Sequence, residues 1–273
     1  MTTLAYLGPA GTFSEQVALT IQSHLPGAIE PVAFPSIMAT VAAVAGGEVT
    51  WGIVPVENSL EGGVAATLDG CWQTDGIFIH RAYILPIRYA LVSTAADFVQ
   101  IQRVYSHPQA LGQCRMWLHE HLPHATSIPS SSTTAELDQL RDPQVGVICS
   151  IRAAEMLKLP VLAWISGQEH NQTRFWLLNR NPAPGGSLTS LALSLPANVP
   201  GALLKPLHIF AARQLNLARI ESRPTKKSAG TYVFFLDVEH PGQRFLSPEV
   251  LADLQVVTET LKILGSYEVI TLS

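Results

Sequence analysis

The sequence predicts an α/β protein that carries a second, smaller domain of different topology at its C-terminal end. Short apolar runs alternate with helical patterns from residue 3 to residue 178, which is typical of a parallel sheet covered by helices. The Pro/Gly-rich segment 179–187 then interrupts the alternation. After it, the expected order of elements becomes βαββαβ, the split ferredoxin-like order. A chain of 273 residues is long enough for both units.

The first unit opens with a βαβαβ pattern whose helices have clear start and stop signals. Thr12 and Glu15 have the spacing of a capping box. Ser36 and Gly46–Gly47 mark the beginning and the end of the next helix. The expected strands are 3–8, 31–34, 51–57, 89–94, 103–107 and 145–150, and the expected helices are 12–25, 36–48, 106–122, 132–140 and 151–159.

Two later helices of this unit are also expected from capping signals. Ser106 and Gln109 form a second capping box, and Pro108 suits the first turn of the helix 106–122. Thr133 and Glu136 form a third box at the beginning of the helix 132–140.

The second unit begins after a boundary near residue 185, which divides the chain into domains 1–182 and 188–273. We expect strands at 188–196, 217–224, 230–239 and 266–273, and helices at 201–216 and 247–264. If the first of these helices begins at Ala202, Pro206 removes a backbone hydrogen bond and kinks it.

Composition and charge exclude several classes of partner. The hydrophobic fraction is 47% and the net charge is −4, without a basic block that would bind nucleic acid. The three cysteines are widely spaced and suggest neither disulfides nor zinc, which fits a reducing compartment. His119, His121 and His124 are wrongly spaced for a metal site on a helix. Without a signal peptide or a membrane-spanning run, we expect a cytoplasmic protein with no membrane partner and no metal.

Two segments place hydrogen-bonding groups where α/β sheets bind ligands. In "LGPAGTFSEQ", Gly8 and Gly11 allow a tight turn before a helix N-terminus, and Thr12 adds a hydroxyl. This corner either binds an anion or is a capped turn without a ligand. In "WGIVPVENSLEGG", Asn58 and Ser59 follow a buried strand at the ligand-binding edge. The nearby Glu57 and Glu61 are expected to be structural, because a carboxylate would repel an anion.

Two further segments carry groups that suit acid or anion chemistry. His107 in "SHPQALGQC" is either a general acid or, more commonly for a first-turn histidine, a cap. In "EHNQTRFWLL", Thr173 supplies a hydroxyl donor and Arg174 a guanidinium that can bind a carboxylate bidentately. Phe175 is expected to pack mainly in the core. The hydroxyl-rich Ser131, Ser132 and Thr133 form a loop and cap that could also line a cleft.

Taken together and in this order, these sequence motifs resemble those of the prephenate dehydratase family. The matching motifs are "GPAGTFSEQ", "VPVENSLEG", "SHPQALGQC", "STTAE" and "NQTRF". They are followed by "GALLKPLHIFAARQLNLARIESRP" and "YVFFLDVE", which are similar to the ACT regulatory domain of that family. The resemblance extends from Leu7 to about Glu239. It implies a catalytic domain of two α/β lobes, like a type II periplasmic binding protein, with the substrate in the cleft between them. The implied reaction converts prephenate to phenylpyruvate, CO₂ and water, without a metal or organic cofactor.

The resemblance also assigns roles to individual residues. Thr173 would assist departure of the ring hydroxyl, Arg174 would hold a carboxylate and Phe175 would shape the pocket. Asn58, Ser59, Thr12 and Gly11 would line it. The implied effector is L-phenylalanine, and the implied assembly is a homodimer or homotetramer. The residues that match the effector-binding words of the family are Gly201, Ala202, Leu203, Glu221, Ser222, Arg223 and Pro224.

The chain departs from the family pattern at Gly167, where the family usually has an acidic residue, and at His240, where it usually has glycine. Two alternatives to a regulated enzyme stay open at this point. One is a sensor on the same fold that binds an amino acid or dicarboxylate without chemistry. The other is an active enzyme whose C-terminal domain serves only to dimerise.

Overall fold

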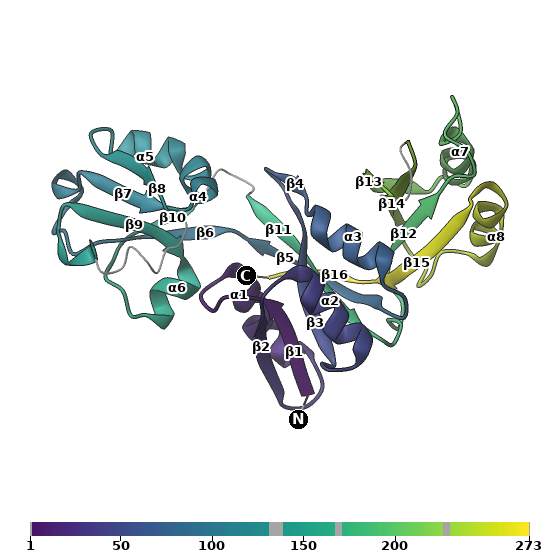
Figure 1. Cartoon of the computed structure of the whole chain (residues 1–273), viewed down its shortest axis with the longest axis horizontal. Helices are drawn as coiled ribbons and strands as arrows, with labels where there is room; N and C mark the ends of the chain where they lie inside the picture. Colours follow the sequence, from purple (N-terminus) through teal and green to yellow (C-terminus); the bar gives the residue numbers. More distant parts are fainter. Residues whose placement is uncertain (1, 131–138, 167–170, 226–229, 273) are drawn as a thin grey trace.

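The computed structural model describes residues 2–130, 139–166, 171–225 and 230–272, and it arranges them as two α/β lobes followed by a C-terminal domain (Figure 1). Most of the helix expected at 132–140, the cleft candidates Ser131, Ser132 and Thr133, and Gly167 lie outside the described residues. Among the described helices, none has both the length and the apolar character needed to cross a membrane.

The first lobe is built on a mixed sheet with the strand order β16-β5-β11-β3-β1-β2, to which β4 adds on β3. Its strands are β1 (Thr2–Leu7), β2 (Ile29–Phe34), β3 (Trp51–Asn58), β4 (Gly62–Gly63), β5 (Phe78–Pro86), β11 (Gln172–Asn179) and β16 (Val269–Thr271). Its helices are α1 (Phe13–Thr20), followed by the 3₁₀ turn η1 (Ile21–His24), α2 (Ile37–Gly46) and α3 (Ala65–Gln73). The expected βαβαβ opening is confirmed, with β1 parallel to both β2 and β3.

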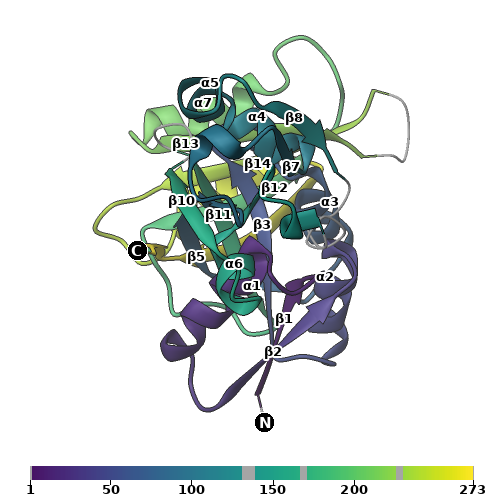
Figure 2. The same cartoon turned by 90° about the vertical axis from the view of Figure 1, so that its left-hand side faces the viewer.

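The second lobe has the strand order β10-β6-β9-β7-β8. Its strands are β6 (Arg88–Val92), β7 (Arg103–Ser106), β8 (Thr126–Pro129), β9 (Val145–Ser150) and β10 (Val161–Ser166), and its helices are η2 (Phe98–Gln100), α4 (Pro108–Gln113), α5 (Arg115–His121) and α6 (Ile151–Met156). The chain passes between the lobes twice, from β5 to β6 and from β10 back to β11. Two such crossings are the arrangement by which two-lobed binding proteins open and close. Figure 2 looks from the second lobe toward the first.

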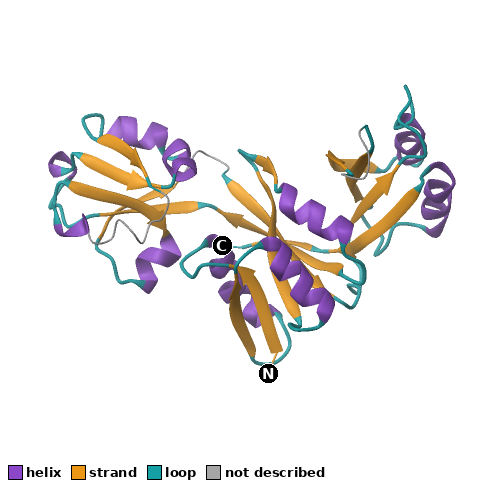
Figure 3. Ribbon diagram, in the orientation of Figure 1, coloured by secondary structure: helices purple, strands orange, loops and turns teal. Residues whose placement is uncertain are grey.

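The C-terminal domain is a four-stranded antiparallel sheet with two helices on one face (Figure 3). Its elements, in the expected βαββαβ order, are β12 (Leu188–Ser194), α7 (Leu204–Ala212), β13 (Asn216–Pro224), β14 (Tyr232–Glu239), α8 (Pro248–Val257) and β15 (Thr260–Tyr267). One face of the sheet packs on these helices through Leu193 and Phe210. The other face packs on the first lobe, where Phe235 and Tyr267 share a core with Trp176. The predicted fold class is therefore confirmed in all three parts.

The last elements of the chain differ from the expectation. The helix expected at 247–264 ends at Val257, and Thr260–Tyr267 forms β15 instead. Pairing of this segment with β12 outweighs its helical propensity. The strand expected at 266–273 is split, because Val269–Thr271 leaves the C-terminal domain and pairs with β5 of the first lobe.

Three helix starts also required correction or refinement. Ser106 does not cap a helix, because its hydroxyl donates to Ile148 O in the neighbouring strand. His107 caps α4 instead, and the expected helix 106–122 is divided at Cys114 into α4 and α5. Helix α7 begins at Leu204, so Pro206 lies in its first turn, where a backbone N–H has no helical acceptor to lose and no kink follows.

Candidate active site between the two lobes

Thr173 and Asn58 form the centre of the candidate site, on adjacent strands of the first lobe. Asn58 Nδ2 donates to Thr173 Oγ1 at 2.9 Å, and Asn58 Oδ1 accepts the backbone N–H groups of Leu60 and Glu61 at 3.0 and 3.2 Å. Because those two N–H groups can pair only with an oxygen, the amide nitrogen of Asn58 must face Thr173. The Thr173 hydroxyl therefore accepts from Asn58, and its own O–H is left to donate.

The hydrogen-bond chain continues from Asn58 into the second lobe. Asn58 also donates to Asn171 Oδ1 at 3.0 Å, and Asn171 Nδ2 donates to Gln113 Oε1 of α4 at 2.8 Å. Gln113 in turn donates to the Glu61 carboxylate at 3.0 Å and accepts from the Tyr89 hydroxyl. Every donor and acceptor in this chain has a consistent direction. We call Asn58, Asn171 and Gln113 the amide relay.

The groups at the ends of the amide relay keep its direction fixed. Burial raises the pKa of Tyr89, which therefore remains a neutral O–H donor to Gln113. The Glu61 carboxylate accepts from both Gln109 and Gln113, so it bonds the first lobe to α4 of the second. This confirms the structural role expected for Glu61. The relay thus connects residues of both lobes to the Thr173 hydroxyl.

A second polar contact joins the lobes at the N-terminus of α1. Arg152 of α6 donates to Glu15 Oε2 at 2.9 Å, and the Gly11 N–H donates to the same oxygen at 2.8 Å. The Ser150 hydroxyl of the second lobe donates to Gly11 O. Burial alone would raise the pKa of Glu15, but the bonds from Arg152 and Gly11 more than offset it and lower that pKa below its usual value.

The N-terminus of α1 is thus a capped turn in this structure. Thr12 Oγ1 accepts from Glu15 N at 3.3 Å and donates to Leu7 O at 3.2 Å. The Glu15 carboxylate lies where the sequence suggested an anion. An anionic ligand could use the Gly11 N–H only by displacing that carboxylate.

Arg174 points to the opposite side of the sheet from Thr173, because consecutive residues of a strand face opposite ways. Its Nη1 lies 3.0 Å from Asp237 Oδ2 in the C-terminal domain and 3.8 Å from Glu57 Oε2. Glu57 thus pairs with a cation, as expected. The structure therefore places the Thr173 hydroxyl and the Arg174 guanidinium on opposite faces of the sheet. Arg174 instead lines a small cavity of about 190 Å³ together with Glu57, Ser59, Ile84 and Gln172.

The other predicted residues of this region hold the strands in place. Phe175 is 1% exposed and packs in the first-lobe core with Tyr83 and Leu177. Ser59 makes two bonds to Gln172, one from its backbone N–H and one to its hydroxyl, and so fixes the pairing of β3 with β11. His107 is a cap rather than a group aimed at Thr173. Within the described ranges, no group of three His, Cys, Asp or Glu side chains could hold a metal ion.

Comparison with known proteins shows the family to which this two-lobed chain belongs. The family model for prephenate dehydratase matches residues 4–183, and that for the ACT domain matches residues 189–244. The chain belongs to the prephenate dehydratase family. The reaction of this family is a hydro-lyase step that converts prephenate to phenylpyruvate, CO₂ and water, and the resemblance seen in the sequence is thereby confirmed.

Individual relatives cover nearly the whole chain. A prephenate dehydratase from Lactococcus lactis is 34% identical over 98% of this chain and 98% of its own length. The structure of a prephenate dehydratase from Arthrobacter aurescens in complex with L-Phe is similar at a TM-score of 0.82 and 36% identity, covering 98% of this chain and 90% of that one. GqqA, described as a novel type of quorum quenching acylase, is similar at a TM-score of 0.77 and 26% identity, over 97% of each chain.

The two predicted effector segments lie apart from the dehydratase site, in the ACT domain. Gly201, Ala202 and Leu203 form the turn before α7, where Gly201 has a φ of 82°. Residues 221–224 end β13, which is an edge strand of the ACT sheet. Glu221 Oε2 lies 3.3 Å from Arg219 Nη1, and Arg223 Nε lies 3.2 Å from Asp69 Oδ1 of α3.

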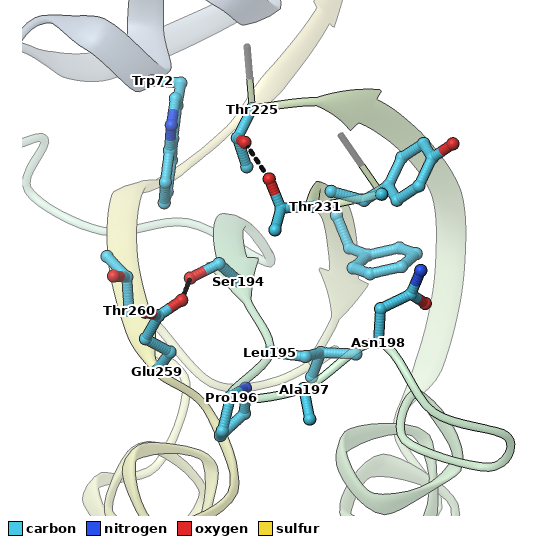
Figure 4. Close-up of a pocket in the computed structure, with 13 residues that line it drawn as sticks. Trp72, Ser194, Leu195, Pro196, Ala197, Asn198, Thr225, Thr231, Glu259 and Thr260 are labelled. Atoms are coloured by element: carbon cyan, nitrogen blue, oxygen red, sulfur yellow. Dashed lines mark hydrogen bonds between the residues drawn. The ribbon is translucent and has the colours of Figure 1, made fainter. Parts of the chain in front are cut away.

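A cavity of about 230 Å³ lies beside both segments of the ACT domain (Figure 4). Its walls are the segment 194–198, the facing ends of β13 and β14, the beginning of β15, and the indole of Trp72 from the first lobe. Glu259 in this cavity accepts a bond from the Ser194 hydroxyl at 3.0 Å. None of the seven predicted effector residues lines the cavity.

The residues that sequence analysis missed are Asn171, Gln113 and Tyr89. Asn171 and Gln113 stand inside the quoted words "NQTRF" and "SHPQALGQC", but a neutral amide gives no signal of its own in one sequence. Tyr89 begins the strand expected at 89–94, to which no role in the site was assigned. Their shared function depends on contacts between two lobes, which no local pattern encodes.

Proposed function

We propose that this chain carries out the dehydratase reaction between its two lobes, with Thr173 as the catalytic hydrogen-bond donor. The observation that carries the proposal is the 2.9 Å bond in which Asn58 donates to Thr173 Oγ1. That bond occupies one lone pair of the Thr173 oxygen and directs its O–H away from Asn58. The amide relay then serves to orient the donor, and closure of the lobes shields the reacting substrate from water.

The chemistry needs little more than positioning and one well-aimed donor. In prephenate, the ring C–OH bond breaks with its electron pair going to oxygen, and the C–CO₂ bond supplies the electrons that complete the aromatic ring. One proton is taken up from solvent, and water, CO₂ and phenylpyruvate are released. A threonine hydroxyl stays protonated at neutral pH, so Thr173 would stabilise the charge that develops on the departing oxygen by a hydrogen bond.

The remaining site residues divide into two groups in this proposal. Asn58, Thr12 and Gly11 would border the substrate on the lobe-facing side, and Ser59 would contribute from the cavity that it shares with Arg174. For Gly11, this requires that the Glu15 carboxylate moves away from its N–H. Arg174 and Phe175, which the resemblance assigns to the substrate, would instead hold the strand that carries Thr173, from the opposite face and from the core.

We further propose that L-phenylalanine regulates the enzyme at the ACT domain, through the segments 201–203 and 221–224. Two features support an assembly of two or four copies. Strand β13 is an edge strand, and Ile220 on it is 48% exposed. In this proposal residues 1–182 are the catalytic unit and 188–273 the regulatory one, although the latter returns β16 to the catalytic sheet. We also propose a cytoplasmic location and activity without metal or cofactor.

The test is to incubate the purified protein with prephenate and to follow phenylpyruvate by its absorbance in alkali, with and without L-phenylalanine. Formation of phenylpyruvate that is lost in a Thr173→Ala variant supports the catalytic proposal. Prephenate that binds without turnover at any enzyme concentration leaves the sensor alternative. Turnover that L-phenylalanine leaves unchanged rejects the regulatory part and leaves the ACT domain a dimerisation unit.

A further inference from the structure

A group of four charged side chains connects the catalytic strand β11 to the ACT domain. Arg174 of β11 and Arg219 of β13 both donate to the same carboxylate, Asp237 of β14, at 3.0 and 2.9 Å. Arg219 also lies 3.3 Å from Glu221, the first residue of the predicted effector segment 221–224. We call these four residues the interdomain charge cluster.

The centre of this cluster is buried, and both oxygens of Asp237 accept hydrogen bonds. Asp237 is 0% exposed and Arg219 is 8% exposed. The other oxygen of Asp237 accepts from the Ser190 hydroxyl at 2.6 Å. The Arg219 guanidinium stacks over Trp176 of β11, 5.4 Å from the ring centroid. A buried carboxylate shared by two guanidiniums cannot lose one of them without a compensating rearrangement.

Arg174 has a second carboxylate within reach, which gives the cluster two possible arrangements. Its Nη1 is 3.0 Å from Asp237 in the ACT domain and 3.8 Å from Glu57 on β3. A shift of Asp237 toward Arg219 would release Arg174 toward Glu57. Since Arg174 is bonded in sequence to Thr173, and Glu57 to Asn58, this exchange acts directly on the two strands that align the catalytic hydrogen bond.

The other end of the cluster touches the same region of the first lobe. A Cβ placed on Gly63 would lie 1.9 Å from Glu221 Oε2, so the Glu221 carboxylate rests on the backbone of β4. Gly63 pairs with Glu57, and Gly62 with Asn58. A ligand that draws Glu221 away would therefore disturb both Arg219 and the segment that follows Asn58.

We propose that the interdomain charge cluster couples the effector segment of the ACT domain to the Thr173–Asn58 pair, with Asp237 as the positioning residue that both arginines share. This inference rests on the proposed function, because it assumes that prephenate turns over at Thr173 and that L-phenylalanine acts through Glu221–Pro224. Coupling of this kind needs a discrete element whose two states both sites bias. The choice of Arg174 between Asp237 and Glu57 is that element.

The test compares the wild-type protein with Arg174→Gln, Asp237→Asn and the control Lys262→Gln. Arg174→Gln removes one partner of Asp237 and leaves Arg219 and Ser190 in place to hold that carboxylate, and circular dichroism would check that the variant is folded. Lys262→Gln is matched to it, since Lys262 of β15 also bridges the ACT domain to the first lobe, through Asp75 at 2.8 Å, but does not touch β11. For each protein we would measure kcat and KM for prephenate, the Kd of L-phenylalanine by calorimetry, and the ratio of kcat with and without L-phenylalanine.

The wild-type protein and Lys262→Gln should both respond to L-phenylalanine, by roughly fivefold or more in activity. Arg174→Gln should bind L-phenylalanine with a similar Kd but lose that response, and its kcat should change with little change in KM. Asp237→Asn, if it folds, should behave in the same way. Hydrogen exchange of the peptide 171–179 should respond to L-phenylalanine in the wild type and not in Arg174→Gln.

Each outcome of this comparison points to one conclusion. A wild-type protein that makes no phenylpyruvate, or ignores L-phenylalanine, overturns the proposed function and the coupling with it. A wild type that responds, together with an Arg174→Gln variant that responds equally, overturns the coupling alone. If Lys262→Gln also lost the response, any contact between the ACT domain and the first lobe would have the same effect as the cluster. That result would also overturn the coupling.

Discussion

Asn58 and Thr173 are joined by a hydrogen bond of 2.9 Å in which the amide donates and the hydroxyl accepts. The direction of this bond is set by two backbone N–H groups on the far side of the amide, at Leu60 and Glu61. The Thr173 hydroxyl is thus oriented through Asn58 by two backbone N–H groups that do not contact it themselves. This predicts which substitutions should affect turnover and which should affect only stability.

Replacing Thr173 by Ala should lower kcat by roughly 100- to 1000-fold and change KM by no more than about threefold. The hydroxyl matters mainly as the ring oxygen departs, so its loss acts on the transition state more than on binding. Thr173→Ser keeps the hydroxyl and should retain most of the activity. Steady-state kinetics with prephenate check this, and normal turnover in the alanine variant would remove Thr173 from the mechanism.

Replacing Asn58 by Asp should lower kcat by about 100-fold, in the range found when one such donor is lost. The introduced carboxylate still accepts from Leu60 and Glu61, but it cannot donate to Thr173. The Thr173 hydroxyl would then donate to that carboxylate and no longer to the substrate.

Asn179→Asp is the matched control for this substitution. Asn179 also accepts a backbone N–H, from Asn181, and donates to a carbonyl, Thr50 O, but it lies at the opposite end of β11. The kcat of the Asn179→Asp variant should equal that of the wild type. If both variants lost activity equally, the effect would reflect disturbance of the strand rather than the direction of the Asn58 bond.

Glu15→Gln should lower the free energy of unfolding by about 2 kcal/mol near neutral pH, because it removes a bond between charged groups of the two lobes. In the folded protein the bonds from Arg152 and Gly11 hold the pKa of Glu15 below the ordinary glutamate value of 4.5. A lowered carboxyl pKa contributes stability that is complete above the unfolded value and is lost as the pH falls through the folded one. The difference between the two proteins should therefore shrink on acidification.

Urea unfolding at neutral pH and at successively lower pH checks this prediction. The half-exposed pair Arg103–Asp142, which lies within the second lobe, provides the comparison. Asp142→Asn should cost less than Glu15→Gln, because the Arg103 and Asp142 side chains are 41% and 44% exposed, so water screens their attraction more strongly. A difference between wild type and Glu15→Gln that grows in acid would contradict the assigned direction of the pKa.

How much of this could be predicted from sequence depends on the range of the contact involved. Local signals were reliable where they were strong, as in the cap of α1 by Thr12 and that of α2 by Ser36. Ser106 had the same type of signal, yet its hydroxyl bonds to Ile148 O of a neighbouring strand. The Ser106 hydroxyl bonds to a distant carbonyl instead of accepting from a backbone N–H of the next helix. A capping pattern in the sequence cannot reveal such a distant partner.

The placement of Thr173 and Arg174 on opposite faces of β11 was not predicted, for a different reason. Adjacent residues are close in sequence, but the alternation of a strand directs them to opposite faces. The segment 172–179 was not among the strands expected from the sequence, so this alternation was not applied to it. By contrast, the bond of Arg174 to Asp237 joins residues 63 positions apart in two domains, and no sequence pattern predicts it.

Replacing Gly186 by Ala should destabilise the protein by ~2 kcal/mol or more, although Gly186 lies in the segment that sequence analysis treated only as a linker. A Cβ at this position would lie 1.9 Å from the backbone carbon of Tyr267 and 2.4 Å from Glu268 N. Because the clash is with backbone, no side-chain rotation relieves it, and the junction of the ACT domain with β15 must move. Gly46→Ala is the control, since a Cβ there meets nothing within 4 Å at the end of α2. Thermal unfolding of both variants measures the effect. An unchanged Tm in Gly186→Ala would mean that the linker does not hold the ACT sheet against the first lobe in the way the structure describes.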